Sequence, residues 1–443
     1  MKRFLLLLSV AAMAMSTLAV VKEPIVFMGN GSRMETAPQM ERRLRLNNLH
    51  LRLSAYPGMT SKRSLIILVD FPDQRFSTDN PAEVWSRIAN ETNYHDGLAY
   101  GSVHDYFLDQ SGGLFDLQFD VLGPVTMPHP VAYYGTNDSN GDDLYADEMI
   151  KEACLAVADT VSFADYDWDG DGELEQVYVL FAGQGENNNT TKRTLIWAHE
   201  YYLSAWDGGE PLVIDGITID TYACSGELSG SHELAGIGTI CHEFAHCLGL
   251  PDLYNISTGM SVLSSWDLMD SGNYNGGGWY PCNFSAYERY FCGWLTLEPL
   301  EGPRDVAELI PVADGGTAYR INGDTDNSFY VLENRQKTGW DTHLPGHGLR
   351  VTAIDYDSVA WQDNTVNSSL GKHVYNVSYW QGSILSLQLT DIREENGLVA
   401  FRYRGEEADA VTPVAAESLP EGREYDMGNG IVIRGGRKFF RRR

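Results

Sequence analysis

The sequence predicts an α/β domain with a mixed sheet, followed by a β-rich C-terminal domain. Between residues 64 and 182, continuous apolar runs alternate with segments that carry apolar residues at helical spacing. This alternation is typical of strands covered by helices. After residue 300 the apolar runs become short and are separated by turn residues, with no competing helical pattern. Such a texture predicts a unit built from sheets.

The individual elements follow from the same periodicity. In the first domain, strands are expected at residues 64–71, 114–121 and 177–182, and helices at 81–92, 101–111 and 144–158. In the second domain, strands are expected at 306–312, 318–322, 329–334, 348–355, 383–389 and 398–403. The chain has 443 residues, and one domain usually takes about 100–200. We therefore expect domains at 63–299 and 300–406, with a linker and basic tail at 407–443.

The N-terminus has the layout of an export signal. A basic start, Met1 to Arg3, precedes an apolar run and a small-residue site, Thr17-Leu18-Ala19. We expect a signal peptide at 1–19 and a short pro-segment at 20–62, so the protein is made as a zymogen and is secreted or delivered to the cell surface. An uncleaved anchor helix is the alternative, although a full span needs about 20 apolar residues. The mature chain is expected to have no transmembrane segment.

Charge and cysteine content narrow the class of protein. The chain has 32 basic and 61 acidic residues, a net charge of −29. This acidity argues against a nucleic-acid partner, because phosphate binding needs clustered Lys and Arg. Acidic side chains can instead hold hard cations. The six cysteines permit disulfides in an exported chain, including Cys282 with Cys292, or all six are small buried side chains.

Residues 237–254 (IGTICHEFAHCLGLPDLY) carry the chemistry. His242 and His246 project from one face of a helix and can hold one metal, with Glu243 beside it. Gly249 ends the helix, and the turn brings Asp252 back as a third ligand. Three protein ligands and one water are typical of catalytic zinc, with Glu243 as the general base. An ordinary amphipathic helix is the alternative, but the added Gly249 and Asp252 favour zinc.

The downstream segment 264–274 (SSWDLMDSGNY) supports this interpretation. Met269 is the candidate for the methionine turn that lies beneath the metal in metzincin metallopeptidases. Tyr274 is a candidate contact to the substrate oxyanion. His199 and His232 lie near the zinc motif in sequence, and a structural role is the simplest interpretation of both.

Residues 165–175 (DYDWDGDGELE) are the second metal candidate. From Asp167 the segment matches the first eight positions of a calcium loop, and Gly172 allows its sharp turn. Tyr178 replaces the usual bidentate glutamate at position twelve, and Glu175 at position nine is the candidate substitute for it. A solvated acidic turn is the alternative. We expect structural Ca²⁺ here, with the candidate ligands Asp167, Asp169, Asp171, Glu173 and Glu175.

Most of residues 64–380 resembles the immune inhibitor A family of secreted metallopeptidases. The resemblance rests on LIILVDFPDQRF, SVHDYFLDQSGGLFDLQFDVLGPV, DYDWDGDGELEQVYVLFAGQGE, the zinc segment, SSWDLMDSGNY, FYVLENRQKTGWDTHLPGHGL and NTVN, in the family's order. It implies a metzincin-like fold, cleavage of proteins, zinc on His242, His246 and Asp252, Glu243 as base and Met269 in the turn. Ala353 is a departure, because a histidine is expected near that position. The tail, residues 423–443, resembles the C-terminal sorting domains of exported Bacteroidetes proteins, and a frayed basic end is the alternative.

These observations favour a secreted zinc endopeptidase that acts on proteins or peptides as a monomer. Two other hypotheses stay open. The first is a metal-binding adhesion module without turnover, against which the intact Glu243 argues. The second is an exopeptidase or a glycoprotein-specific peptidase.

Overall fold

A computed structural model describes residues 60–139, 141–206, 208–362, 364–368, 373–377 and 381–405. It also gives the backbone of three short strands, β17 (Glu424–Asp426), β18 (Ile431–Arg434) and β19 (Arg437–Phe440). The expected signal peptide, nearly all of the pro-segment, the linker and the remainder of the tail lie outside the described residues.

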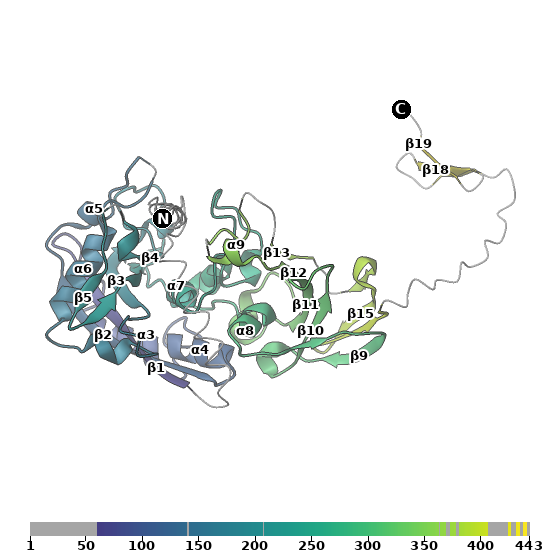
Figure 1. Cartoon of the computed structure of the whole chain (residues 1–443), viewed down its shortest axis with the longest axis horizontal. Coiled ribbons are helices and arrows are strands. Elements are labelled where there is room, and N and C mark those ends of the chain that lie inside the picture. Colours follow the sequence, from purple (N-terminus) through teal and green to yellow (C-terminus); the bar gives the residue numbers. More distant parts are fainter. Residues whose placement is uncertain are drawn as a thin grey trace, which may run out of the picture.

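The first half of the chain forms a five-stranded mixed sheet in the order β2-β1-β3-β7-β4 (Figure 1). Its strands are β1 (Thr60–Asp70), β2 (Phe115–Thr126), β3 (Val177–Gln184), β4 (His199–Tyr202) and β7 (Thr221–Leu228). The first four in that order are parallel, and β4 pairs antiparallel with β7. The predicted mixed sheet is therefore confirmed.

Helices cover both faces of this sheet because the central strands are apolar on both sides. Ile66 and Leu68 of β1 join the core cluster that contains α3 (Pro81–Asn90), α4 (Val103–Gln110) and α7 (Gly238–Cys247). Leu65 and Ile67 point the other way, into the cluster with α6 (Ala146–Val157). The remaining α-helices and strands that the structure describes before residue 297 are α5 (Val131–Tyr134), β5 (Leu212–Ile214), β6 (Ile217–Ile219) and α8 (Ala286–Phe291).

Two further sheets follow, as the sequence predicts for this region. One has the order β13-β12-β11-β10-β8, and the other β14-β15-β16-β9. Their strands are β8 (Leu297–Pro299), β9 (Arg304–Leu309), β10 (Ala318–Asn322), β11 (Ser328–Arg335), β12 (Gly348–Asp355), β13 (Val374–Asn376), β14 (Gly382–Ile384), β15 (Leu389–Glu395) and β16 (Leu398–Tyr403).

Two sequence predictions in this region are wrong. Residues 383–389 are not one strand, because a 3-10 turn (Leu385–Leu387) separates β14 from β15 and Gln388 takes a left-handed backbone with φ of 57°. A short helix, α9 (Ser358–Gln362), also follows β12 where no helix is expected.

The second half of the chain shares its core with the first. Val331 and Ile354 of β11 and β12 belong to the same apolar cluster as Phe244 of α7. On the opposite face of the same strands, Leu332 and Val351 pack with the four-stranded sheet. Figure 1 shows α7 between the two halves, so the helix is covered from both sides.

Two other properties bear on the sequence predictions. All six cysteines are buried free thiols, as in the second of the two interpretations above. Among the described residues, no helix has the length and apolar character that crossing a bilayer requires.

Candidate active site

Helix α7 is held tightly at its start. A Cβ atom on Gly238 would lie 1.8 Å from the carbonyl oxygen of Asn273, so only glycine allows this approach. One face of the helix is apolar and buried, with Ile240, Phe244 and Leu248 at most 1% exposed. The polar side chains on the helix are buried too. Such side chains are seldom buried unless they are paired with a partner or bind a ligand.

The helix ends at Gly249, as predicted. Its φ of 84° is left-handed, its N–H donates to His246 O (2.8 Å), and Leu250 N–H donates to Ala245 O (3.3 Å). This pair of bonds is a Schellman motif, which reverses the chain direction. The reversal brings Asp252 back against the helix face that carries the two histidines.

His242, His246 and Asp252 converge as the sequence predicts. The Nε2 atoms of His242 and His246 lie 3.2 and 3.5 Å from Asp252 Oδ1. Each histidine Nδ1 is 2.8 Å from a backbone carbonyl, Leu268 O for His242 and Leu250 O for His246. A carbonyl can only accept, so Nδ1 carries a proton, and in the neutral form of each ring Nε2 presents its lone pair to the centre of the group.

The segment around Met269 supports two of these residues through its backbone. Leu268 O accepts from His242, and Met269 O accepts from Leu253 N–H at 2.7 Å, next to Asp252. The Met269 side chain is fully buried in the core cluster. The predicted methionine segment therefore lies against the histidine and aspartate pair.

Asp252 is also held by a residue far along the chain. Asn364 Oδ1 accepts from Asp252 N–H (2.6 Å), and Asn364 Nδ2 donates to Asp252 Oδ2 (2.9 Å). This two-point contact leaves only Oδ1 facing the histidines. Asn364 belongs to the NTVN stretch, which the sequence shows without revealing its role.

Glu243 lines the same cavity as His242, His246 and Asp252, and burial together with two of these neighbours shifts its pKa. Burial raises its pKa to about 7, His242 opposes that shift and Asp252 adds to it. Burial lowers the pKa of His242, but Asp252 and Glu243 outweigh it and the pKa rises to about 9. Burial would raise the pKa of Asp252, yet His246 and His242 bring it below its ordinary value. The raised pKa values of Glu243 and His242 both reflect negative charge gathered in a buried space.

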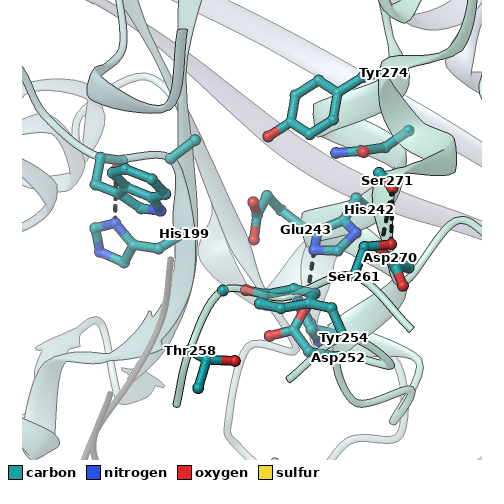
Figure 2. A pocket seen from close by; sticks show the side chains of 15 residues that line it. His199, His242, Glu243, Asp252, Tyr254, Thr258, Ser261, Asp270, Ser271 and Tyr274 are labelled. Carbon is teal, nitrogen blue, oxygen red and sulfur yellow. Dashed lines mark hydrogen bonds and ion pairs between the residues drawn. The ribbon is translucent and has the colours of Figure 1, made fainter. Parts of the chain in front are cut away.

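These side chains line a cavity of about 410 Å³. Figure 2 shows Glu243, His242 and Asp252 within it, and Tyr274 with its hydroxyl directed toward the side where Glu243 lies. Tyr274 is 49% exposed, so it borders the opening. Trp197 and Tyr254 also line the cavity, and neither was expected from the sequence. The place of Tyr254, two residues after Asp252, was the available signal.

His199 lines the cavity as a neutral side chain. Its Nδ1 lies 2.8 Å from Trp197 O and its Nε2 2.8 Å from Tyr222 Oη. Burial lowers its pKa to about 4, with the Trp197 carbonyl opposing. His232 is exposed, with a left-handed φ of 65°, and does not line this cavity.

Residues 54–294, more than half of the chain, match the family model described as "Immune inhibitor A peptidase M6, catalytic domain". The chain belongs to the immune inhibitor A peptidase M6 family. The resemblance noted from the sequence is thereby confirmed.

Curated relatives of this M6 chain are distant and longer. Immune inhibitor A of Bacillus thuringiensis subsp. alesti is 25% identical over 281 residues, which are 54% of this chain and 40% of that protein. Pre-pro-metalloprotease PrtV of Vibrio cholerae serotype O1 (strain M66-2) is 26% identical over 291 residues, 53% of this chain and 31% of that protein. The M6 chain thus matches less than half the length of either relative.

The M6 histidine and aspartate group fits a zinc ion. Its three ligand atoms lie within 4.8 Å of one another, and all three residues are buried. Asp252 Oδ1 accepts no hydrogen bond of good geometry from the described residues, although it is buried. Two imidazole nitrogens and a carboxylate oxygen are ordinary zinc ligands. A cation there would satisfy an oxygen that is otherwise costly to bury.

The acidic loop of the M6 chain brings together three of its five predicted ligands. Asp167, Asp169 and Glu175 place one oxygen each within 4.8 Å of one another. Asp171 and Glu173 are outside that group. Asp171 Oδ1 accepts from Glu173 N–H at 2.9 Å and so stabilises the turn itself.

Proposed function

We propose that this chain is an exported zinc-dependent endopeptidase that hydrolyses peptide bonds in proteins. The observation that carries the proposal is the buried group of His242, His246 and Asp252 with Glu243 beside it in one cavity. The family membership of residues 54–294 supports it. The names of the two relatives, which include a metalloprotease, are consistent with it.

The side chains divide the work as follows. His242, His246 and Asp252 hold zinc, which when bound supplies Lewis acidity and lowers the pKa of water. Glu243 takes a proton from the attacking water and delivers it to the departing amine. The Tyr274 hydroxyl donates a hydrogen bond to the carbonyl oxygen as that atom gains charge.

The test is a Glu243→Gln variant assayed with casein and a peptide library. Zinc content should stay at one equivalent, because Glu243 is not a ligand, while turnover falls by roughly two orders of magnitude or more. Chelation should abolish wild-type cleavage, and zinc should restore it. Undiminished cleavage by Glu243→Gln would refute this mechanism. Zinc binding by the wild type with no cleavage of any substrate would favour the adhesion module.

The acidic loop is proposed to hold a structural Ca²⁺ through Asp167, Asp169 and Glu175. Carboxylate oxygens at alternate positions are typical calcium ligands. Calcium should raise the thermal unfolding midpoint of the wild type more than that of Asp169→Asn. An equal rise in both would remove this loop as a site.

Export and architecture complete the proposal. The apolar N-terminus and the word pre-pro in the name of PrtV support a signal peptide, a pro-segment and secretion. The HExxH helix, the Met269 segment and the mixed sheet support a metzincin-like fold. We also propose that the chain acts as a monomer, which sedimentation of the secreted form would test.

A further inference from the structure

Two buried carboxylates lie beside the cavity wall and take no part in the proposed chemistry. Glu186 is 1% exposed and Asp143 is 7% exposed. Neither oxygen of Glu186, nor Oδ1 of Asp143, accepts a hydrogen bond of good geometry from the part of the chain that the structure describes. Burial raises the pKa of Glu186, and the nearby Asn137 side chain and Arg193 oppose that rise without reversing it. Buried carboxylates almost always have hydrogen-bond partners, so three unsatisfied oxygens in one place call for an explanation.

One peptide unit joins the two residues. The carbonyl of Ile196 accepts from Glu186 N–H at 2.8 Å, and the N–H of Trp197, in the same peptide, donates to Asp143 Oδ2 at 2.9 Å. The charge of Glu186 is near enough to raise the pKa of Asp143, which burial already raises well above its ordinary value. The two carboxylates therefore share one confined, negatively charged space.

Asn137 adds a further oxygen. Its backbone pairs with Asp143 in an isolated antiparallel bridge, and its N–H donates to Arg193 O at 3.3 Å. Its Nδ2 donates to Gly141 O at 2.9 Å, whereas its buried Oδ1 has no partner among the described residues. Asn137, Asp143 and Glu186 thus offer four side-chain oxygens.

We propose that Asn137, Asp143 and Glu186 form a binding site for a hard divalent cation, Ca²⁺. Ca²⁺ takes six to eight oxygen ligands, including carboxylates, amide oxygens, backbone carbonyls and water. Four side-chain oxygens of the right types leave room for carbonyls or water. The site is separate in sequence and composition from the acidic loop at Asp167. It is also separate from the zinc group, by which we mean the proposed zinc ligands His242, His246 and Asp252.

The guanidinium of Arg193 is a cation that already lies near Glu186. Arg193 Nη1 lies 3.4 Å from Glu186 Oε1, but the Arg193 side chain is 60% exposed. A single solvated guanidinium at that distance offsets part of one carboxylate's charge and leaves Asp143 unmatched. In our proposal Arg193 competes with Ca²⁺ for Glu186 instead of replacing it.

The site would brace the wall of the cavity. Trp197, whose peptide joins Asp143 and Glu186, lines the cavity together with His199 of β4. A cation at Glu186 and Asp143 fixes both ends of the loop between β3 and β4, since residue 186 follows β3 and residue 197 precedes β4. Calcium at this site should therefore order the cavity wall without contacting the proposed zinc ligands.

Calcium titration of the full chain tests the proposal, in a Glu243→Gln background that avoids self-cleavage. The protein is depleted of calcium, reloaded with one equivalent of zinc and titrated by calorimetry. Glu186→Gln and Asp143→Asn should each weaken one class of calcium binding by roughly tenfold or more, because both remove charge from a ligand. Asp169→Asn, in the separate acidic loop, should leave that class intact.

Arg193→Ala separates the proposal from a simple ion pair. If Arg193 competes with calcium, its removal should tighten binding of that class. The proposal is overturned if Glu186→Gln and Asp143→Asn titrate like their parent. It is also overturned if Arg193→Ala leaves calcium affinity unchanged and lowers the unfolding midpoint equally with and without calcium. Zinc content is measured in every variant, so loss of the proposed active site would be seen separately.

Discussion

At the scale of single residues, the cavity-lining His199 makes the stability of the fold depend on pH. Both ring nitrogens are engaged by Trp197 O and Tyr222 Oη, and burial lowers its pKa from 6.5 to about 4. A depressed histidine pKa favours the folded state only while the ring is neutral. Its contribution is complete above pH 6.5 and is lost as the pH falls toward 4. The shift corresponds to about 3 kcal/mol.

We therefore predict that His199→Gln reduces the dependence of stability on pH. Urea unfolding at pH 7 and pH 5 should show a smaller loss for the variant than for the wild type, because glutamine does not titrate. Other buried carboxylates change stability over the same range, so the comparison is between the two slopes. Parallel curves for both proteins would mean that His199 is not neutral in the folded state.

Asn364 is the residue whose role the sequence hides most completely. Its two contacts hold the backbone N–H and the carboxylate of Asp252, and its own backbone has a left-handed φ of 52°. Glycine adopts that conformation without strain, so Asn364→Gly removes the contacts and spares the turn. We predict a loss of zinc affinity of roughly tenfold to a hundredfold, measured by chelator competition.

A matched control exists for this change. Asn396 also has a left-handed φ, of 54°, and is exposed in the turn between β15 and β16. Asn396→Gly makes the same chemical change far from the zinc group and should leave zinc affinity unaltered. Equal affinities for both variants and the wild type would show that Asp252 needs no such support.

At the scale of elements, the sequence predicts the histidine helix well because its signals are local. The spacing of His242 and His246 fixes their common face, and Gly249 marks the end of the helix. Trp197 and Asn364 reach this region from other segments, and no pattern in the surrounding sequence predicts that they do. Tertiary contacts of this kind depend on the whole fold, so helical or strand periodicity cannot reveal them.

The turn after α7 should affect both the unfolding midpoint and the affinity for metal. Alanine at Gly249 would have to adopt a φ of 84°, which costs about 1 kcal/mol or more for a residue with a Cβ. We predict that Gly249→Ala lowers both the unfolding midpoint and the zinc affinity, because the same turn delivers Asp252. Gly315→Ala, at a φ of 82° with open space around it, should lower only the midpoint. Unchanged zinc affinity in Gly249→Ala would separate the turn from the site.

At the scale of the whole molecule, the sequence predicts a second domain beyond residue 300, and the structure has sheets there. Their packing is the unexpected part. Val331 and Ile354 share one core with Phe244. Asn364 donates a hydrogen bond to Asp252, one of the proposed zinc ligands. The change in texture near residue 300 marks a change in secondary structure, because local composition reports strands and turns but not which surfaces are buried together.

A buried ion network lies at the junction between the two halves of the chain, and substitutions in it can test whether the halves unfold together. Arg350 of β12 lies 3.2 Å from both Asp267 and Glu333, and it donates to Trp266 O at 3.2 Å. All three charged side chains are at most 5% exposed. Asp267 precedes Leu268, whose carbonyl accepts from His242, so the network connects the second half of the chain to the proposed zinc ligands.

Replacing Arg350 should therefore lower the free energy of unfolding of both halves of the chain together. Arg350→Met keeps much of the volume but removes the cation beside the buried Asp267, whereas Glu333 retains Arg335 Nη1 at 3.6 Å. Removing one partner of a buried pair typically costs about 3–5 kcal/mol, so we expect roughly that loss. Urea unfolding should remain a single transition, shifted to lower urea, because both halves share the core. Arg402→Met breaks an exposed ion pair with Asp305 and should hardly move the transition. If Arg350→Met instead shifted one of two separate transitions, the halves would be independent and the junction would not support the zinc group.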